Sequence, residues 1–468
     1  TELTTNYTPW SHEMAHRIVY KVDVLEDWGL KFPSGTPQIN AFELEGGWYD
    51  AGDFDRRPVH LLTVGHLLTL HEILPNLGET LNIPESGNGI PDILDEALFG
   101  LRSFETLQED DGGVRGGVES TGHPGFTGAA DDAFVYWTYT RNRYTSYEFA
   151  SVAAHASRLL ADVPGQAARA TELRDRAIRA WNWAEAQTTI GTTGPSGNMS
   201  SEGSLNRTRM SAAGSLFALT NNTVYRDAFG EHEGLINPSY WQNLYGVWSM
   251  ANAQDSNVNT LRDRARTKIL NSANEYISTL EGNAYRNGLG SQYSDENIAW
   301  GNGTNGIKYA LPAIMAYHFS PEQRYVDAVS LGADFQLGAH PSGMSWMTGL
   351  GIKTPEYPLH LISMYDNITE PVPGLPINGP SARRSECTSN YFGCPVYNGF
   401  TPNFMTDVPA YHTYSPWARM APMNEFTVWT DMGYTTLGYG FLYGVSGESA
   451  QDLSGLTPSQ YPLNALTR

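Results

Sequence analysis

Apolar residues at helical spacing recur along most of this chain, with long loops rich in glycine, asparagine and proline between them. One helix is predicted from a capping box of Thr145 and Glu148, keeps an apolar face from Phe149 to Val163, and ends at Pro164. Two more helices are predicted from apolar faces at Leu173, Ala177, Ala180, Trp181 and Ala184, and at Leu261, Ala265, Ile269, Ala273, Tyr276 and Leu280.

Another helix is expected to begin in the segment 320–323, where Pro321 suits a first helical position. The remaining helical stretches are predicted near 10–20, 56–75, 92–108, 210–219, 240–253, 306–318 and 425–443. About a dozen helices without clear strand alternation predict an all-α protein. A bundle or solenoid remains open at this point, but the long loops favour a closed helical array with a loop-built site on one face.

Composition narrows the classes of partner. Over 468 residues the net charge is −21, which disfavours nucleic acid and anionic membrane surfaces but suits a neutral polymer. No apolar run is long enough for a transmembrane helix, and no linker or break in composition divides the chain, so 1–468 is expected to be one domain.

The cysteines and the glycosylation-type triplets bear on localisation. Cys387 and Cys394 are spaced to close a small loop in an oxidising compartment, and six glycosylation-type triplets occur. No signal peptide is visible, so the sequence is expected to be a mature, secreted form.

The segment from Gly46 to Asp53 is the densest in potential chemistry. It reads Gly-Gly-Trp-Tyr-Asp-Ala-Gly-Asp, and so places the carboxylates of Asp50 and Asp53 three residues apart, beside the rings of Trp48 and Tyr49. Glycine permits tight turns, and aspartate often bonds its own backbone in them, so a structural turn is one interpretation. The other is catalysis, because acids beside flat rings can hold a sugar and activate a water.

Three later segments are further candidates for a functional site. Glu425 follows Asn424 where a C-terminal helix is expected to open, a position where an acid ordinarily favours the helix dipole. Two stretches rich in glycine and proline, 337–351 and 371–380, flank His360 in one long irregular region that is too apolar for disorder.

These segments together resemble glycoside hydrolase family 9, the inverting cellulases. The Asp-Ala-Gly-Asp motif at 50–53 is followed in the family's order by matches at 87–96, 337–351, 371–380 and 424–425. The resemblance implies an α/α toroid of six helical hairpins with an open cleft at one end. It also implies endo-type hydrolysis of a β-1,4-linked glucan by a protein expected to be monomeric, with no cofactor required.

The resemblance also assigns roles. Asp53 would be the general base, Asp50 would help to hold the same water, and Glu425 would be the general acid. His360 and Trp300 stand at sugar-binding positions, and Tyr49 is a further candidate. Because the acid must stay protonated, the pKa of Glu425 is expected to be raised, whereas Asp53 is expected to stay ionised.

The chain departs from the family pattern around the cleft. Leu359-His360-Leu361 replaces a His-His-Arg triplet, and Arg383 or Arg384 is a candidate substitute for the missing arginine. Thr430 and Asp431 stand where an aromatic residue and asparagine are common, and His340 stands where asparagine is usual. An alternative is therefore a toroid that binds glycans but has lost catalysis.

Two motifs suggest metals. His12-Glu13-Met14-Ala15-His16 matches a zinc-peptidase pattern, whereas a surface helix in the toroid's first element is the simpler interpretation. The acidic run 109–111 is a candidate calcium loop, as relatives often bind structural calcium, against the alternative of a solvated turn.

Overall fold

The computed structural model describes residues 15–23, 32–50, 52–77, 81, 83–125, 127–187, 202–238, 244–255, 258–288, 305–365, 368–381, 402, 407, 412–418 and 420–447. Within them the chain is mainly helical, and no described helix is both long enough and apolar enough to cross a bilayer. Trp300, Cys387, Cys394, Arg383, Arg384 and His12 lie outside the described residues.

In one group of helices most residues are buried or half-buried. It consists of α1 (His60–Ile73), α3 (Arg143–Leu160), α5 (Glu202–Thr220), α7 (Leu244–Asn252), α10 (Leu311–Phe319) and α15 (Gly433–Ser446). In α1, buried residues run without a break from His60 to His71. Helices with so little exposed surface lie inside the molecule, so these helices form the inner layer.

A second group is amphipathic and buries mainly one face, although α2 is buried on most sides because it also packs against the segment before α1. Its members are α2 (Asp92–Thr106), α4 (Ala167–Ala186), α6 (Thr223–Gly230), α8 (Asn259–Glu281) and α11 (Gln323–Gln336). The buried residues of α4 include all five predicted for it, and α8 buries five of its six predicted residues, all but Leu261. These amphipathic helices form the outer layer.

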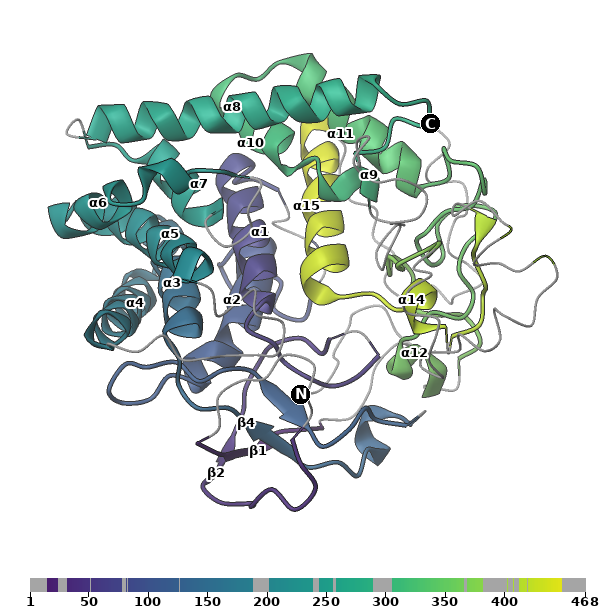
Figure 1. The fold of residues 1–468 in the computed structure, drawn as a ribbon, viewed down its shortest axis with the longest axis horizontal. Coiled ribbons are helices and arrows are strands. Elements are labelled where there is room, and N and C mark those ends of the chain that lie inside the picture. Colours follow the sequence, from purple (N-terminus) through teal and green to yellow (C-terminus); the bar gives the residue numbers. More distant parts are fainter. Residues whose placement is uncertain are drawn as a thin grey trace.

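The helices close into a ring. Each helix contacts the next in the order α1, α3, α5, α7, α8, α10 and α15, and α15 in turn contacts α1. Figure 1 shows the purple α1 and the yellow α15, from opposite ends of the chain, side by side in the middle of the molecule. The predicted α/α toroid is confirmed. Shorter helices, α9 (Asn305–Lys308), α12 (Leu361–Tyr365) and α14 (Ala421–Asn424), lie in the connecting regions.

A small sheet adds to the helices. Strands β1 (Ile18–Lys21), β2 (Ala41–Glu43), β3 (Val118–Ser120) and β4 (Tyr136–Thr138) pair in the order β2-β1-β4-β3, with β1 and β4 parallel. The prediction of a helix near 10–20 is therefore wrong where this segment is described. Strands of three or four residues are too short to show a period of two, so no sequence pattern indicated them.

Helix boundaries differ from the predictions where a different residue forms the cap. Asn142, not Thr145, caps α3, and its side chain accepts the backbone N–H of Thr145 at 2.8 Å. The helix predicted from 320–323 begins at Gln323, so Pro321 lies before its first residue. Both helices exist as predicted, and only their first turns differ.

The contact between α5 and α7 depends on two glycines. A Cβ on Gly246 would lie 2.3 Å from the Cα of Ser211, and one on Gly214 would lie 2.3 Å from the carbonyl oxygen of Gly246. Neither backbone can yield without moving a whole helix, so these positions exclude any side chain.

We predict that Gly246→Ala lowers the free energy of unfolding by about 1–3 kcal/mol, because the added methyl group overpacks a backbone contact. Urea denaturation measures the change. Gly203→Ala, which adds the same methyl group where only the end of Arg207 is near, is the matched control and should have a neutral or slightly stabilising effect. Equal losses in both variants would contradict the packing argument.

Candidate active site

The segment 46–57, here called the catalytic loop, lies directly against α2. Gly46 and Gly47 have φ values of 64° and 78°, and a Cβ on either would lie within 2.6 Å of Phe99 or Ser103 atoms. The Gly47 N–H donates to the Phe99 carbonyl at 2.9 Å. Glycine is therefore required at both positions, for backbone conformation and for close approach.

Inside this loop the two predicted carboxylates are nearly buried. Asp50 is 6% exposed and Asp53 is 9% exposed. The Asp53 N–H donates to the Asp50 carbonyl at 3.0 Å, and the Asp55 N–H donates to Asp53 Oδ1 at 3.3 Å. Asp53 Oδ2 also lies 3.3 Å from Nδ1 of His123, whose side chain is 57% exposed. The loop therefore forms a structured turn and holds Asp53 beside a polar group that solvent can reach.

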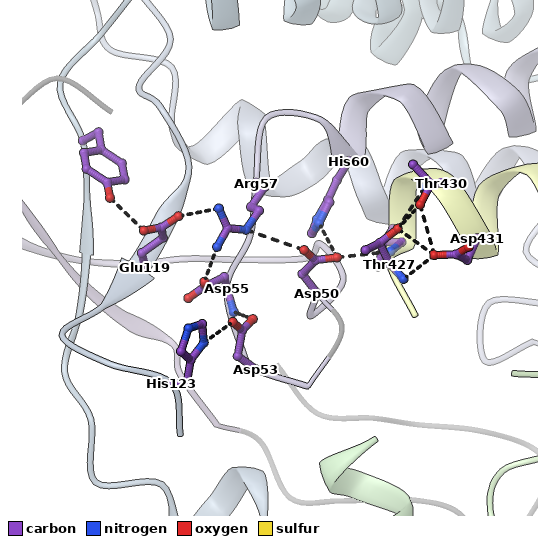
Figure 2. Close-up of polar contacts among 12 residues, drawn as sticks. Asp50, Asp53, Asp55, Arg57, His60, Glu119, His123, Thr427, Thr430 and Asp431 are labelled. Atoms are coloured by element: carbon purple, nitrogen blue, oxygen red, sulfur yellow. Dashed lines mark hydrogen bonds and ion pairs between the residues drawn. The ribbon is translucent and has the colours of Figure 1, made fainter. Parts of the chain in front are cut away.

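Arg57 is the hub of this acidic cluster. Its guanidinium lies 2.9 Å from Asp55, 2.8 Å from Glu119 and 3.5 Å from Asp50 (Figure 2). Burial alone would lower the pKa of Arg57, but Glu119 and the three aspartates of the loop together raise it well above its usual range. Arg57 therefore stays charged and compensates the negative charge of these buried acids.

The carboxylate of Asp50 also faces the C-terminal part of the ring. Its Oδ1 accepts the backbone N–H of Val428 at 3.1 Å and lies 3.4 Å from His60 Nε2. Val428 begins a π-helical turn, η6 (Val428–Met432), and such turns are frequent at functional sites. The bond joins the catalytic loop to the segment that carries Glu425.

That segment, residues 424–431, is here called the acid segment. Asp431 is fully buried, and its Oδ2 accepts the backbone N–H of Thr427 at 2.8 Å and the hydroxyls of Thr427 and Thr430 at 2.9 and 3.0 Å. Figure 2 shows this cluster on the opposite side of Asp50 from Arg57. Thr430 and Asp431, which depart from the family pattern, thus hold the turn after Glu425.

Glu425 itself does not open a helix, contrary to the prediction. It follows α14 in an extended conformation (φ −77°, ψ 163°), and the helical segment begins three residues later. The side chain is half-buried. The Asn378 N–H donates to its carbonyl at 2.7 Å, and the Leu359 N–H donates to the Asn424 carbonyl at 2.7 Å. The segments around 359 and 371–380 therefore lie beside the acid segment.

A cavity of about 280 Å³ brings several predicted residues together. Tyr49, Asp53 and His360 line it, with Phe426 from the acid segment. His360 Nδ1 lies 2.7 Å from the Ser363 hydroxyl and accepts the Ser363 N–H at 3.3 Å, so Nε2 carries the proton. Leu361, at the position of the missing arginine, also lines the cavity, which makes this wall apolar.

A further acid lines the same cavity. Trp48 Nε1 donates to Glu96 Oε1 at 2.7 Å, and the Trp48 ring packs on Gly100, where a Cβ would lie 2.1 Å away. Burial raises the pKa of Glu96; Trp48 opposes the rise, and Glu85 and Asp95 add to it. A carboxyl group with a raised pKa thus lies in the same cavity lining as Trp48.

The described residues of the two metal motifs bind protein groups. His16 is not on a surface helix: it precedes β1, and its buried ring bonds Tyr49 and Asp132. In the acidic run, Glu109 pairs with Lys21 and Arg115, and Asp111 pairs with Arg141. No three His, Cys, Asp or Glu side chains in the described part of the chain are grouped to hold a metal.

Sequence reasoning missed Arg57, Glu119, His60 and His123. Their partners come from separate elements, so no local spacing marks them. A weak signal was available for Arg57, since an arginine so close to three aspartates is a natural counter-ion.

The known proteins with similar sequences and folds are glycoside hydrolases. The model of the family described as glycosyl hydrolase family 9 matches residues 6–422. A xyloglucan-specific endo-β-1,4-glucanase, BoGH9A of Bacteroides ovatus, is 27% identical over 365 residues, covering 72% of this chain and 60% of that protein. A cellulose 1,4-β-cellobiosidase of Acetivibrio thermocellus is 25% identical, covering 76% of this chain and 45% of that protein.

Solved structures show the same fold. The structure of AaCel9A in complex with cellobiose-like isofagomine superposes with a TM-score of 0.75 at 20% identity, covering 94% of this chain and 80% of that one. The chain spans about half to three fifths of the length of the two curated relatives described above.

We predict that Arg57→Met lowers the free energy of unfolding at pH 7 by about 3–5 kcal/mol, because three carboxylates lose a buried partner. Without the counter-ion Arg57, the charged form of each of these buried carboxylates is disfavoured in the folded variant. Their protonation then favours the folded variant, so the difference from wild type should shrink as pH falls from 7 toward 5. Denaturant titrations at both pH values measure this.

Arg324→Met, which breaks an exposed pair with Glu322, is the control and should change stability little at either pH. A difference for Arg57→Met that stays constant or grows on acidification would contradict the proposed hub.

Proposed function

Because the chain belongs to glycosyl hydrolase family 9, we propose that it is an inverting glycoside hydrolase that cleaves internal β-1,4-glucosidic bonds of cellulose or a related β-glucan. The observation that carries the proposal is the meeting of the catalytic loop and the acid segment beside one cavity. The names of the relatives, a xyloglucan-specific endoglucanase and a cellobiosidase, support a β-1,4-glucan as the substrate class.

In this proposal Asp53 is the general base. Its Oδ2 faces the exposed His123 and its side chain lines the cavity, so a water there can reach it. Asp53 would take a proton from that water as the water attacks the anomeric carbon. Glu425, across the bond, would protonate the leaving oxygen, a geometry that needs a separation of roughly 6.5–9.5 Å between the carboxyls.

Asp50 would act mainly by positioning the catalytic loop and by its negative charge near the attacking water. Both its oxygens already face protein donors, Val428 N and His60 on one side and Arg57 on the other. It therefore helps the attacking water through its negative charge and by fixing the loop, rather than as a second base. The pKa of Glu425 stays predicted to be raised, as an acid that protonates a leaving group requires.

The sugar contacts follow from the cavity. His360 would present a protonated Nε2 to the sugar, and Tyr49 would present its ring, while Trp300 is retained from the sequence as a stacking residue. Substitution of the usual arginine by Leu361 removes a charged sugar contact. We therefore expect weaker recognition of one hydroxyl group there.

Further parts of the proposal rest on the sequence. We propose a secreted, monomeric, single-domain protein in which Cys387 and Cys394 form a disulfide, with no cofactor required for hydrolysis. The net charge of −21 favours a neutral polysaccharide over nucleic acid or an anionic membrane.

Inversion can be read directly from the product. We predict that freshly cleaved cellopentaose first shows the α-anomer at the new reducing end, because the water attacks opposite the β-linked leaving group. Proton NMR recorded before mutarotation measures it. An initial excess of the β-anomer would exclude an inverting mechanism.

We also predict that Asp53→Asn and Glu425→Gln each lower kcat by about 10²–10⁴-fold while leaving thermal unfolding near that of wild type. Glu322→Gln, an exposed acid on the outer layer, is the control and should keep full activity. Near-native turnover in either variant would remove that residue from its role. A wild-type protein that binds cellulose without releasing sugars would instead support the catalytically inactive, glycan-binding alternative.

A further inference from the structure

His16, the last residue of the zinc-peptidase motif, has a buried and unusual position. Its side chain is 4% exposed, and its backbone has a φ of 53°, in the left-handed region that non-glycine residues rarely adopt. Such a conformation persists only where surrounding contacts hold it, and it is common at functional sites.

The imidazole touches both ends of the turn that carries Asp50 and Asp53. Its Nδ1 lies 3.0 Å from the hydroxyl of Tyr49, the residue before Asp50. Its ring stacks on Phe54, the residue after Asp53, with centroids 4.5 Å apart and planes 26° apart. Tyr49 and Phe54 also meet edge to face at 5.0 Å, so the three rings form one cluster.

Asp132 orients the imidazole from the other side. Its Oδ2 lies 3.0 Å from His16 Nε2 and accepts the hydroxyl of Tyr136 at 2.7 Å. Burial acts to raise the pKa of Asp132, but its hydrogen bonds, that from His16 foremost, hold it below the usual value, so Asp132 is ionised. The His16 Nε2–H therefore donates to Asp132, and Nδ1 accepts from Tyr49.

We propose that His16 is a positioning residue that, held by Asp132, clamps Tyr49 and Phe54 and so fixes the catalytic loop on which Asp53 lies. The inference deepens the proposed function and rests on it for the role of Asp53. The clamp comes from the segment before β1, outside the helical ring, so a part of the chain that contributes no catalytic group sets the geometry of the base.

The charge state of His16 suits this role. Burial lowers the pKa of His16 and nearby Arg56 lowers it further, while Asp132 opposes both effects. A neutral ring can accept from Tyr49, whereas a protonated ring cannot. Tyr136 also faces the ring, and burial raises the pKa of its hydroxyl.

The experiment compares four variants. His16→Phe keeps a ring against Phe54 but removes both hydrogen bonds, and His16→Asn keeps an acceptor near the Nδ1 position. Tyr49→Phe removes the hydroxyl, and the double variant His16→Phe/Tyr49→Phe completes a cycle. The control is His155→Gln, in another buried histidine–carboxylate pair. His155 lies 2.8 Å from Glu72. Glu72 is near the far end of α1, about 18 Å along the helix from His60.

Two quantities are measured on each protein: kcat and KM on cellopentaose, and amide hydrogen exchange of the peptide that spans 47–57. His16→Phe should lower kcat by about 10–100-fold, as expected for a misplaced catalytic group, with a smaller change in KM. Exchange should quicken in 47–57, with α2 unchanged. His16→Asn should recover part of the lost kcat, and the two substitutions of the cycle should be non-additive.

The control should lose stability without a change in kcat or in exchange of 47–57. Wild-type kcat or wild-type exchange of 47–57 in His16→Phe, additive losses in the cycle, or an equal response of the control would each overturn the clamp. If the wild type does not turn over β-glucans, the proposed function fails, and the exchange measurement alone still decides whether His16 holds the loop.

Discussion

The hydrogen bond from the Val428 backbone to the Asp50 carboxylate joins residues 378 positions apart in the sequence. It forms at the seam where α15 returns to α1 and the helical ring closes. The same seam brings the catalytic loop and the acid segment together. The contacts that close the ring therefore also assemble the candidate active site. Neither the catalytic loop nor the acid segment forms the site alone.

This arrangement concentrates charge in a buried place. Asp50, Asp55 and Glu119 share Arg57, and Asp431 is satisfied by the backbone and hydroxyl donors of Thr427 and Thr430. Buried ion pairs seldom add net stability, since desolvation offsets their attraction. Their contribution here is positional: Asp50 is held from two sides, which leaves Asp53, one turn further on, as the carboxylate beside solvent.

The sequence predicted what depends on local pattern. The buried faces of α4 and α8 were predicted correctly except for Leu261, because an outer helix has one apolar side. Asp50, Asp53, Tyr49 and His360 were found through motifs, and the structure places them around one cavity or its loop. The roles assigned to them stay predictions.

What the sequence could not show depends on contacts between distant segments. The four short strands carry too few residues for an alternating pattern, and Arg57 gains its role from Glu119, far along the chain. His16 looked like part of a metal motif because spacing alone cannot show that Asp132 and Tyr49 occupy its two nitrogens. Glu425 was expected to open a helix. The helical turn instead begins after Thr427, whose backbone N–H donates to the buried Asp431.

The most direct test of the central claim is a crystal structure of the Glu425→Gln variant with a bound cello-oligosaccharide. The account predicts a water within hydrogen-bond distance of the Asp53 carboxylate, beneath the anomeric carbon and on the face opposite position 425. An oligosaccharide bound away from Asp53, or an Asp53 that bonds a sugar hydroxyl with no water beneath that carbon, would contradict it.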